Sequence, residues 1–338
     1  MKDTFPLGAE RLYYHRLDFR LSPVAAIRPD AWLGAVLRNS LLYAAATIPV
    51  DGTRSLFSVL ETYPGEPDFT HPFYKEWAGG FPKGFSVGCP PLFPSGFTYP
   101  LIRKNEIFTC SLCLIGHMSQ YAMHVVEAMR GVCERGIGKP IIPLQLIDVS
   151  EWHPVRGSRL IALSKGPVET LENPVCLRDC FQLWPERQGR IEFSLETPLC
   201  LVRKRQKADP AVSYQDKQNG FPSFYQFVRS LAYRLMKLYI LYVGNGIYPD
   251  AGETVRQIDE WIGGATAFEL ETATLRSVTL TGPPRKENRA RMMFTGYTGT
   301  MTYTGDFRKF FPLLLFAENL GVGNDTVYGL GKYRITAY

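Results

Sequence analysis

Hydrophobic and polar positions follow two different periods along the first half of the chain. An aromatic-rich, partly alternating run over 12–21 predicts a strand, and apolar residues spaced three and four apart over 31–47 predict a helix. An apolar strand over 106–115, a helix over 118–135 and a strand over 141–147 follow. The predicted order is therefore strand, helix, strand, helix, strand.

The second half has the same order. A strand over 191–195 precedes a long helix over 222–243, and the Thr/Tyr-rich segment 291–303 predicts a strand pair or one bent strand. Asp306 is placed to cap a further helix, and a last strand runs over 332–335. The two halves therefore repeat one supersecondary unit.

This repeated unit predicts the fold class and the domains. It indicates an α+β protein with two tandem ferredoxin-like (RRM-like) domains, whose antiparallel sheets carry helices on one face. We expect an N-terminal domain over 1–150, a linker or connecting segment over 151–190 and a C-terminal domain over 191–338 with a glycine-rich loop. The N-terminal domain contains a long Pro/Gly/aromatic-rich loop over 61–100, and loops of that length are usually functional or mobile.

Composition and charge indicate the class of protein and the kind of partner that it can bind. The 338 residues are 45% hydrophobic and 21% charged, which is typical of a globular protein and excludes disordered, collagen-like and coiled-coil chains. Residues 1–200 hold 20 basic and 20 acidic side chains, whereas residues 201–338 hold 18 basic and 12 acidic ones. The whole net charge of +6 therefore lies in the second part, and this one-sided excess permits a polyanionic partner.

Two basic clusters contribute to this excess. Neighbouring cations repel one another unless a polyanion or solvent screens them, so each cluster binds a polyanion or is a solvated loop. The residues are Arg203, Lys204, Arg205 and Lys207 in the first cluster and Arg285, Lys286, Arg289 and Arg291 in the second. We expect both clusters to bind RNA.

The N-terminal residues and the cysteines indicate the cellular compartment of the protein. The first residues lack the apolar stretch of a secretory signal, and no uncharged apolar run approaches the roughly 18 residues needed to span a bilayer. Seven cysteines, an odd number, favour a reducing cytoplasm. Cys110 and Cys113 fall three apart in a predicted strand and so point to opposite faces. We expect a cytoplasmic protein with no membrane contact, no metal site and no cofactor.

The segment 321–333 is the most specific stretch of the chain. Glycines at 321, 323, 329 and 331 allow sharp turns and a close approach to a ligand. Exposed backbone N–H groups in such a loop can bind phosphate, and Lys332 adds a cation. A nucleotide P-loop is excluded because its signature is absent, and a Rossmann fingerprint is excluded because a helix precedes the loop and a strand follows it.

In its place after a helix near the C-terminus, this segment resembles the glycine-rich loop of the RAMP superfamily of CRISPR-associated proteins. The wider run from Gly296 to Tyr333 is similar to one branch, the CRISPR repeat-processing endoribonucleases, and the helices at 31–47 and 118–135 fall where that family has counterparts. The resemblance implies two ferredoxin-like domains side by side, a basic cleft for a repeat stem, and metal-independent cleavage of precursor CRISPR RNA. In that reaction the ribose 2′-OH attacks the adjacent phosphate and leaves a 2′,3′-cyclic phosphate.

The resemblance also implies partners and binding residues. The partners are CRISPR repeat RNA or crRNA, together with other subunits of CRISPR-associated complexes. The RNA-binding residues of the loop are Gly321, Gly323, Asn324, Gly329, Gly331 and Lys332.

The catalytic residues are less clearly marked. The reaction needs a base near the 2′-OH, an acid near the 5′-oxygen and cations for the charge on phosphorus. Many relatives carry a histidine on or near the first helix, but residues 30–48 contain none. The candidates are Arg38 and Tyr43 on that helix and His15 on the first strand. With an ordinary pKa of about 10, Tyr43 is an acid or a donor rather than a base, unless it packs in the core. His15 lies either in a cleft or on the surface.

Three functions stay open at this point. The chain is a repeat-processing endoribonuclease, a catalytically inactive RNA-binding subunit of a CRISPR interference complex with the same fold, or a general α+β RNA-binding module outside CRISPR systems. The missing histidine favours the second function, whereas the family-like C-terminal run opposes the third.

Overall fold

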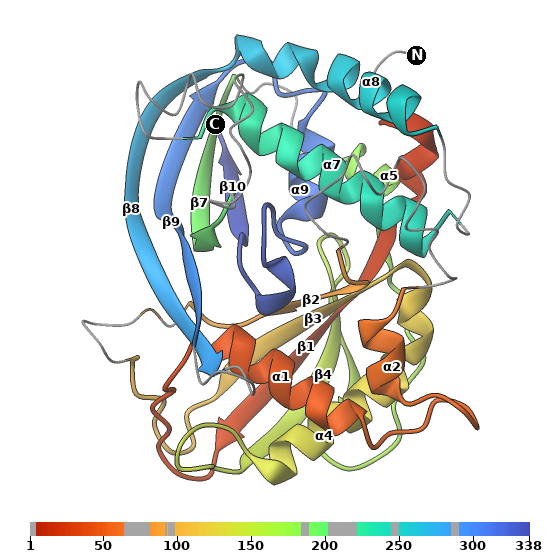
Figure 1. The fold of residues 1–338 in the computed structure, drawn as a ribbon, viewed down its shortest axis with the longest axis vertical. Helices are drawn as coiled ribbons and strands as arrows, with labels where there is room; N and C mark the ends of the chain where they lie inside the picture. The colour runs from red at the N-terminus through yellow and green to blue at the C-terminus, as the bar shows by residue number, and fades with distance from the viewer. Residues whose placement is uncertain are drawn as a thin grey trace.

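Two antiparallel sheets, each with helices against one side, lie one above the other in the molecule (Figure 1). The structure is a computed structural model, and it describes residues 5–63, 82–91, 93, 99–183, 189–201, 222–244, 250–284 and 291–338. Within these residues no helix is long and apolar enough to cross a membrane.

The first sheet has its strands in the order β2-β3-β1-β4-β5, and β6 pairs with the start of β1. These strands are β1 (Tyr13–Pro23), β2 (Phe85–Gly88), β3 (Phe108–Ile115), β4 (Leu144–His153), β5 (Gly157–Leu163) and β6 (Val175–Cys176). The helices of this half are η1 (Pro6–Arg11), α1 (Leu33–Ala45), α2 (Leu56–Glu61), η2 (Gly116–Tyr121), α4 (Ala122–Arg135) and α5 (Leu177–Cys180).

The second sheet has its strands in the order β10-β7-β9-β8. They are β7 (Arg190–Leu199), β8 (Glu269–Pro284), β9 (Arg291–Thr304) and β10 (Tyr333–Ala337). The helices of this half are α7 (Phe224–Tyr242), α8 (Ala251–Ile262), η3 (Gly263–Ala267), α9 (Phe311–Ala317) and η4 (Thr326–Tyr328).

Both sheets have the connectivity of a ferredoxin-like unit. The chain order is β1-α1-β2-β3-α4-β4 in the first and β7-α7-β8-β9-α9-β10 in the second, with α2 and α8 as additions. In each sheet the first and third strands of the unit lie between the fourth and the second. The predicted α+β fold with two ferredoxin-like units is therefore confirmed. In the segment 151–190, which we expected to be a connection, β5 and β6 add strands to the first sheet.

Strand β1 shows how the sequence makes one face of the first sheet polar. Successive side chains on a strand point to opposite faces. Leu17 and Phe19 are buried in the main hydrophobic core, which lies between the sheets and their helices. Arg16, Asp18 and Arg20 alternate with them, so they belong to the face that the helices leave open.

Three details differ from the sequence predictions. The Thr/Tyr-rich segment is one long strand, β9, which agrees with the second of the two predicted alternatives, but its partner is β8, which the sequence pattern did not reveal. Helix α9 has Phe310 at its N-cap position, so Asp306 does not cap it and instead pairs with Arg308. Strand β4 begins at Leu144 rather than at 141.

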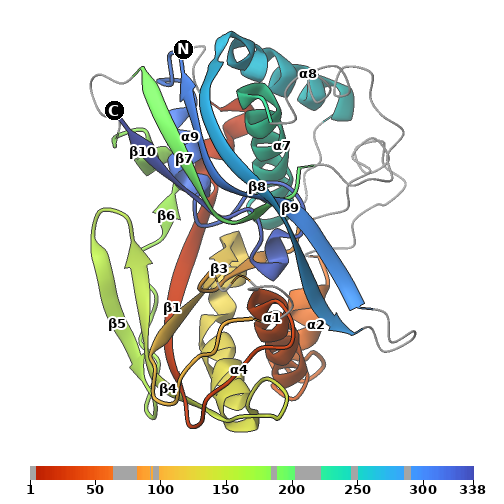
Figure 2. The ribbon, with the colours of Figure 1, turned by 90° about the vertical axis from the view of Figure 1, so that its left-hand side faces the viewer.

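The hairpin of β8 and β9 reaches beyond its own sheet to the first helix (Figures 1 and 2). There Leu280 and Phe294 form a second hydrophobic cluster around Trp32. The guanidinium of Arg291 donates a hydrogen bond to the carbonyl of Asp30 at 2.6 Å. The β8–β9 hairpin of the second unit therefore binds the residues just before α1 in the first unit.

Candidate functional site

The glycine-rich loop connects α9 to β10 and folds back on itself. Gly321, Gly323, Gly329 and Gly331 all have positive φ, between 71° and 82°. The amide of Val322 donates to the carbonyl of Gly331 at 2.9 Å, and a Cβ on Gly331 would lie 1.9 Å from the carbonyl oxygen of Val322. Glycine is therefore required at 331, because any side chain would push the two arms of the loop apart.

Several backbone amides of this loop donate within the protein. The amides of Gly321, Asn324, Gly329 and Gly331 donate to backbone carbonyls, and the amide of Lys332 donates to Oγ1 of Thr197 at 2.8 Å. These N–H groups are therefore not free to bind a phosphate. The glycines determine the shape of the loop, and its side chains rather than its backbone amides are available to contact a ligand.

The ammonium group of Lys332 is buried between the two sheets. The residue is 6% exposed, and its Nζ donates to the hydroxyl of Ser86 at 3.1 Å. Burial lowers the pKa of Lys332 to about 8, and the nearby cations Arg16 and Arg234 act in the same direction. A bound anion would stabilise the charged form of this amine.

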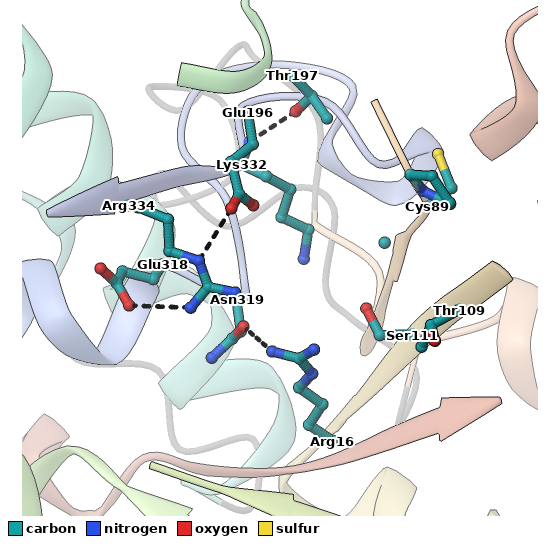
Figure 3. A pocket seen from close by; sticks show the side chains of 12 residues that line it. Arg16, Cys89, Thr109, Ser111, Glu196, Thr197, Glu318, Asn319, Lys332 and Arg334 are labelled. Carbon is teal, nitrogen blue, oxygen red and sulfur yellow. Dashed lines mark hydrogen bonds and ion pairs between the residues drawn. The ribbon is translucent and has the colours of Figure 1, made fainter. Parts of the chain in front are cut away.

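Lys332 faces a pocket of about 160 Å³ where the two sheets meet (Figure 3). The first half contributes Arg16, Gly88, Cys89, Pro90, Thr109 and Ser111, and the second half contributes Glu196, Thr197, Glu318, Asn319, Lys332 and Arg334. Figure 3 shows Lys332 and Arg16 extending toward each other, with the hydroxyl of Ser111 beside them. The pocket is thus built from both units.

The guanidinium of Arg16 is held in place on three sides. Its Nε and Nη2 donate to the carboxylate of Asp18 at 2.7 and 3.1 Å, and its Nη1 donates to Oδ1 of Asn319 at 2.6 Å. The group also lies 4.6 Å from the centre of the Trp152 ring. A guanidinium fixed in this way loses little freedom when it binds an oxyanion.

Carboxylates balance only part of the positive charge in the pocket. Oε1 of Glu196 accepts a hydrogen bond from Nε of Arg334 at 2.9 Å. Burial raises the pKa of Glu318 to about 7, so this carboxyl group is partly neutral at neutral pH. The pocket therefore suits an anion.

The first helix lies against the same loop. The guanidinium carbon of Arg38 is 4.7 Å from the centre of the Tyr328 ring, and its Nη2 donates to Oε1 of Glu61 at 2.6 Å. The Arg38 side chain is 11% exposed, and its buried Nε makes no hydrogen bond within the described part of the chain. Lys83 lies beside Glu61, and burial lowers the pKa of its amine. Arg38, a cation of the first unit, thus contacts the loop of the second.

The other two catalytic candidates lie elsewhere. Tyr43 is 68% exposed and packs against the guanidinium of Arg135, 4.7 Å from its ring centre, so it is not a core residue. His15 is buried, and its Nδ1 lies 2.6 Å from Oε1 of the fully buried Glu151. His15 also precedes Arg16 on β1 and so points to the opposite face. The structure therefore does not bring Arg38, Tyr43 and His15 together.

Most of the predicted basic clusters lies outside the residues that the structure describes. This applies to Arg203, Lys204, Arg205, Lys207, Arg285, Lys286 and Arg289, and to most of the loop over 61–100. Arg291 is described, and it binds Asp30 near the start of α1. Cys110 and Cys113 are buried in β3, and across the described ranges no group of three or more His, Cys, Asp or Glu side chains is arranged to hold a metal ion.

Sequence reasoning missed several residues of the pocket. Arg16, Asp18 and Arg20 recur at every second position of a predicted strand, and this spacing could have indicated a polar sheet face. No comparable signal marks Asn319, which follows α9 and binds Arg16 across a separation of 303 residues. Such contacts follow from the packing of the two units.

Comparisons with known proteins agree with this description. Residues 193–333, from β7 to the start of β10, match the family model described as CRISPR-associated endoribonuclease Cas6. No curated protein sequence matches the chain. Two similar solved structures carry the titles "Partial Cas6-RT-Cas1--Cas2 complex" and "Cas6-RT-Cas1--Cas2 complex". Each has a TM-score of 0.56 and 11% sequence identity over 97% of this chain.

These two likenesses show a shared fold. The present chain covers 46% of one of those chains and 29% of the other, so it spans less than half of their length. The match over residues 193–333 contains the glycine-rich loop on which the sequence comparison depended. The predicted resemblance to the CRISPR repeat-processing endoribonucleases is confirmed over these matched residues.

Proposed function

We propose that the chain binds precursor CRISPR RNA and cleaves it within its repeats without a metal ion. The ribose 2′-OH loses its proton and attacks the adjacent phosphate, the bond from phosphorus to the 5′-oxygen breaks, and that oxygen takes up a proton. The products are a 2′,3′-cyclic phosphate and a 5′-OH end. The observation that carries the proposal is the contact of Arg38 with Tyr328. It joins the segment that matches the family model to the helix to which the resemblance assigns catalysis.

Three cations of the site have a role in this proposal. Arg38 stabilises the negative charge that develops on the scissile phosphate with its guanidinium, which Glu61 and the ring of Tyr328 hold in place. Lys332 and Arg16 bind a second phosphate of the RNA in the pocket between the sheets. Gly321, Gly323, Gly329 and Gly331 shape the loop that carries Lys332.

We propose crRNA and other CRISPR-associated proteins as the partners. The titles of the two similar structures name complexes that contain Cas1 and Cas2. The excess positive charge of the second part of the chain supports a polyanionic partner.

A catalytically inactive RNA-binding subunit is the second candidate. Residues 30–48 contain no histidine, and His15 is tied to Glu151 away from the pocket. Such a subunit would use the same pocket and loop to hold its RNA.

One experiment separates the two functions. The full chain is incubated with repeat RNA in excess EDTA, and the product ends are analysed. A single cut that leaves a 2′,3′-cyclic phosphate supports the endoribonuclease, and Arg38→Gln should then slow the cut by about 100-fold. Tight repeat-specific binding without a cut supports the inactive subunit, and equal affinity for repeat and unrelated RNA contradicts both.

A further inference from the structure

Trp32 connects three parts of the molecule at the start of α1. It is fully buried, and its carbonyl accepts hydrogen bonds from the first amides of its own helix. Its backbone amide donates to the carbonyl of Thr281 on β8 at 2.7 Å. Its indole Nε1 donates to the carbonyl of Tyr328 in the glycine-rich loop, also at 2.7 Å. Helix α1 is thus fixed by the second unit from two directions.

The contact with the loop is close because the helix has a glycine there. A Cβ on Gly34 would lie 2.2 Å from the carbonyl oxygen of Tyr328 and 2.8 Å from Nε1 of Trp32. No side chain fits between the helix and the loop at this point. The carbonyl of Tyr328 therefore lies directly against α1, where it accepts the hydrogen bond of Trp32.

Tyr328 contacts both Trp32, through its carbonyl, and Arg38, through its ring. Its ring lies under the guanidinium of Arg38, at 4.7 Å, and 5.2 Å from the ring of Phe294 on β9. The carbonyl of Tyr328 is held by Trp32, and its ring packs between Arg38 and Phe294. A shift of this residue therefore moves the surface against which Arg38 rests.

We propose that Trp32 is a positioning residue, which holds the glycine-rich loop in register with α1 so that RNA on the loop is aligned with Arg38. This inference rests on the proposed endoribonuclease function. The indole N–H is a donor only, and a phenyl ring in its place leaves the part-buried Tyr328 carbonyl without that hydrogen bond. Small misplacements of catalytic groups slow a reaction by up to about 100-fold, whereas RNA affinity depends on many separate phosphate contacts.

The test compares Trp32→Phe with Trp261→Phe in the full chain. Trp261 is a matched control because it is also buried in the core, and its Nε1 has no hydrogen-bond partner within the described residues. We expect Trp32→Phe to slow single-turnover cleavage of repeat RNA by about 10- to 100-fold with an almost unchanged Kd, while Trp261→Phe changes neither. In an Arg38→Gln background, Trp32→Phe should add little, because both changes act on the same group.

The outcomes separate this inference from the function on which it rests. If the wild-type chain cleaves and Trp32→Phe cleaves equally well, the role of Trp32 is wrong and the endoribonuclease function stands. Equal losses of rate and affinity, or a full additional loss in the Arg38→Gln background, also contradict the role of Trp32. If the wild-type chain never cleaves, both proposals fall. Should Trp32→Phe not fold, Tyr328→Leu keeps the carbonyl that Trp32 binds but removes the ring under Arg38, and it must slow cleavage with intact binding. An unchanged rate would contradict the role of Trp32, because Trp32 acts through that ring.

Discussion

Residues 136–139 and 329–332 share a Gly-x-Gly-Lys pattern, each ahead of the last strand of its ferredoxin-like unit. All four glycines have positive φ, but Gly136 and its counterpart Gly329 differ in ψ, at 176° and 18°, so the two segments leave their first glycine in different directions. The Lys139 side chain is 68% exposed and lies 3.7 Å from Asp30, whereas Lys332 is 6% exposed and faces the pocket. The sequence pattern is common to both units, and the surroundings of each segment decide what its lysine contacts.

The surroundings differ because only the second of these two segments packs against the other unit. A Cβ on Gly329 would lie 3.0 Å from the carbonyl oxygen of Val87 on β2, and Lys332 reaches Ser86 on the same strand. The segment 136–139 instead closes on its own unit through the bridge between Ile137 and Ile142. The candidate site is therefore a product of the contact between two similar units rather than of the motif itself.

The largest expected difference between the segments is in stability. Gly331→Ala places a Cβ 1.9 Å from a backbone oxygen, whereas Gly138→Ala meets its nearest atom, Cγ2 of Ile27, at 3.2 Å. We expect Gly331→Ala to lower the free energy of unfolding by about 3 kcal/mol or more, and Gly138→Ala by about 1–2 kcal/mol, since both also force a positive φ. Chemical denaturation measures both values. Equal losses would show that the loop relaxes and that the close contact of its arms is unimportant.

The next difference is in RNA affinity. Lys332→Met removes the cation that, in our proposal, binds a phosphate of the RNA. Lys139→Met removes a surface cation outside the site. We expect Lys332→Met to raise the Kd for repeat RNA by about 10- to 100-fold and to reduce the salt slope of binding by about one unit. Lys139→Met should leave both quantities nearly unchanged. Titrations at several salt concentrations check this, and similar effects of the two variants would remove the pocket from the RNA-binding site.

A smaller effect concerns pH. Because burial lowers the pKa of Lys332 to about 8, the wild-type amine loses its charge between pH 7 and pH 9. RNA phosphates stay charged over this range, so the affinity should fall by up to about tenfold as the pH rises through 8. Lys332→Arg keeps its charge throughout and should remove the part of this dependence that is due to Lys332, while the ionisation of Glu318, whose pKa is raised to about 7, is unchanged. A wild-type affinity that is flat from pH 7 to pH 9 would contradict a contact between Lys332 and phosphate.

Much of the fold could be predicted from periodicity alone. The core faces of α1, α4 and α7 repeat at helical spacing, and β1 and β3 are rich in branched and aromatic side chains. Strand β8 was missed because it is an edge strand with exposed polar residues, and its register shifts between Leu270 and Thr272, which breaks the period of two. Helix α8 was also missed, although its residues 251–262 are amphipathic.

The site was predictable only in part. The loop glycines and Lys332 were marked by composition and by resemblance, and Arg38 by its place on the first helix. Burial of Lys332 was not marked, because it depends on β2 of the other unit. His15 was an attractive candidate by residue type, but its environment is set by Glu151 on the neighbouring strand. The burial of Lys332 and the environment of His15 both depend on contacts between segments far apart in the sequence. A single sequence does not reveal such contacts.

The most direct measurement of the whole account is a time course of repeat-RNA cleavage in excess EDTA by the wild-type chain, Lys332→Met and Lys139→Met. We predict that the wild type and Lys139→Met produce the same 2′,3′-cyclic phosphate end at equal rates. Lys332→Met should be at least about tenfold slower at subsaturating protein. Absence of the cut in the wild type, or equal rates for all three proteins, would contradict the account.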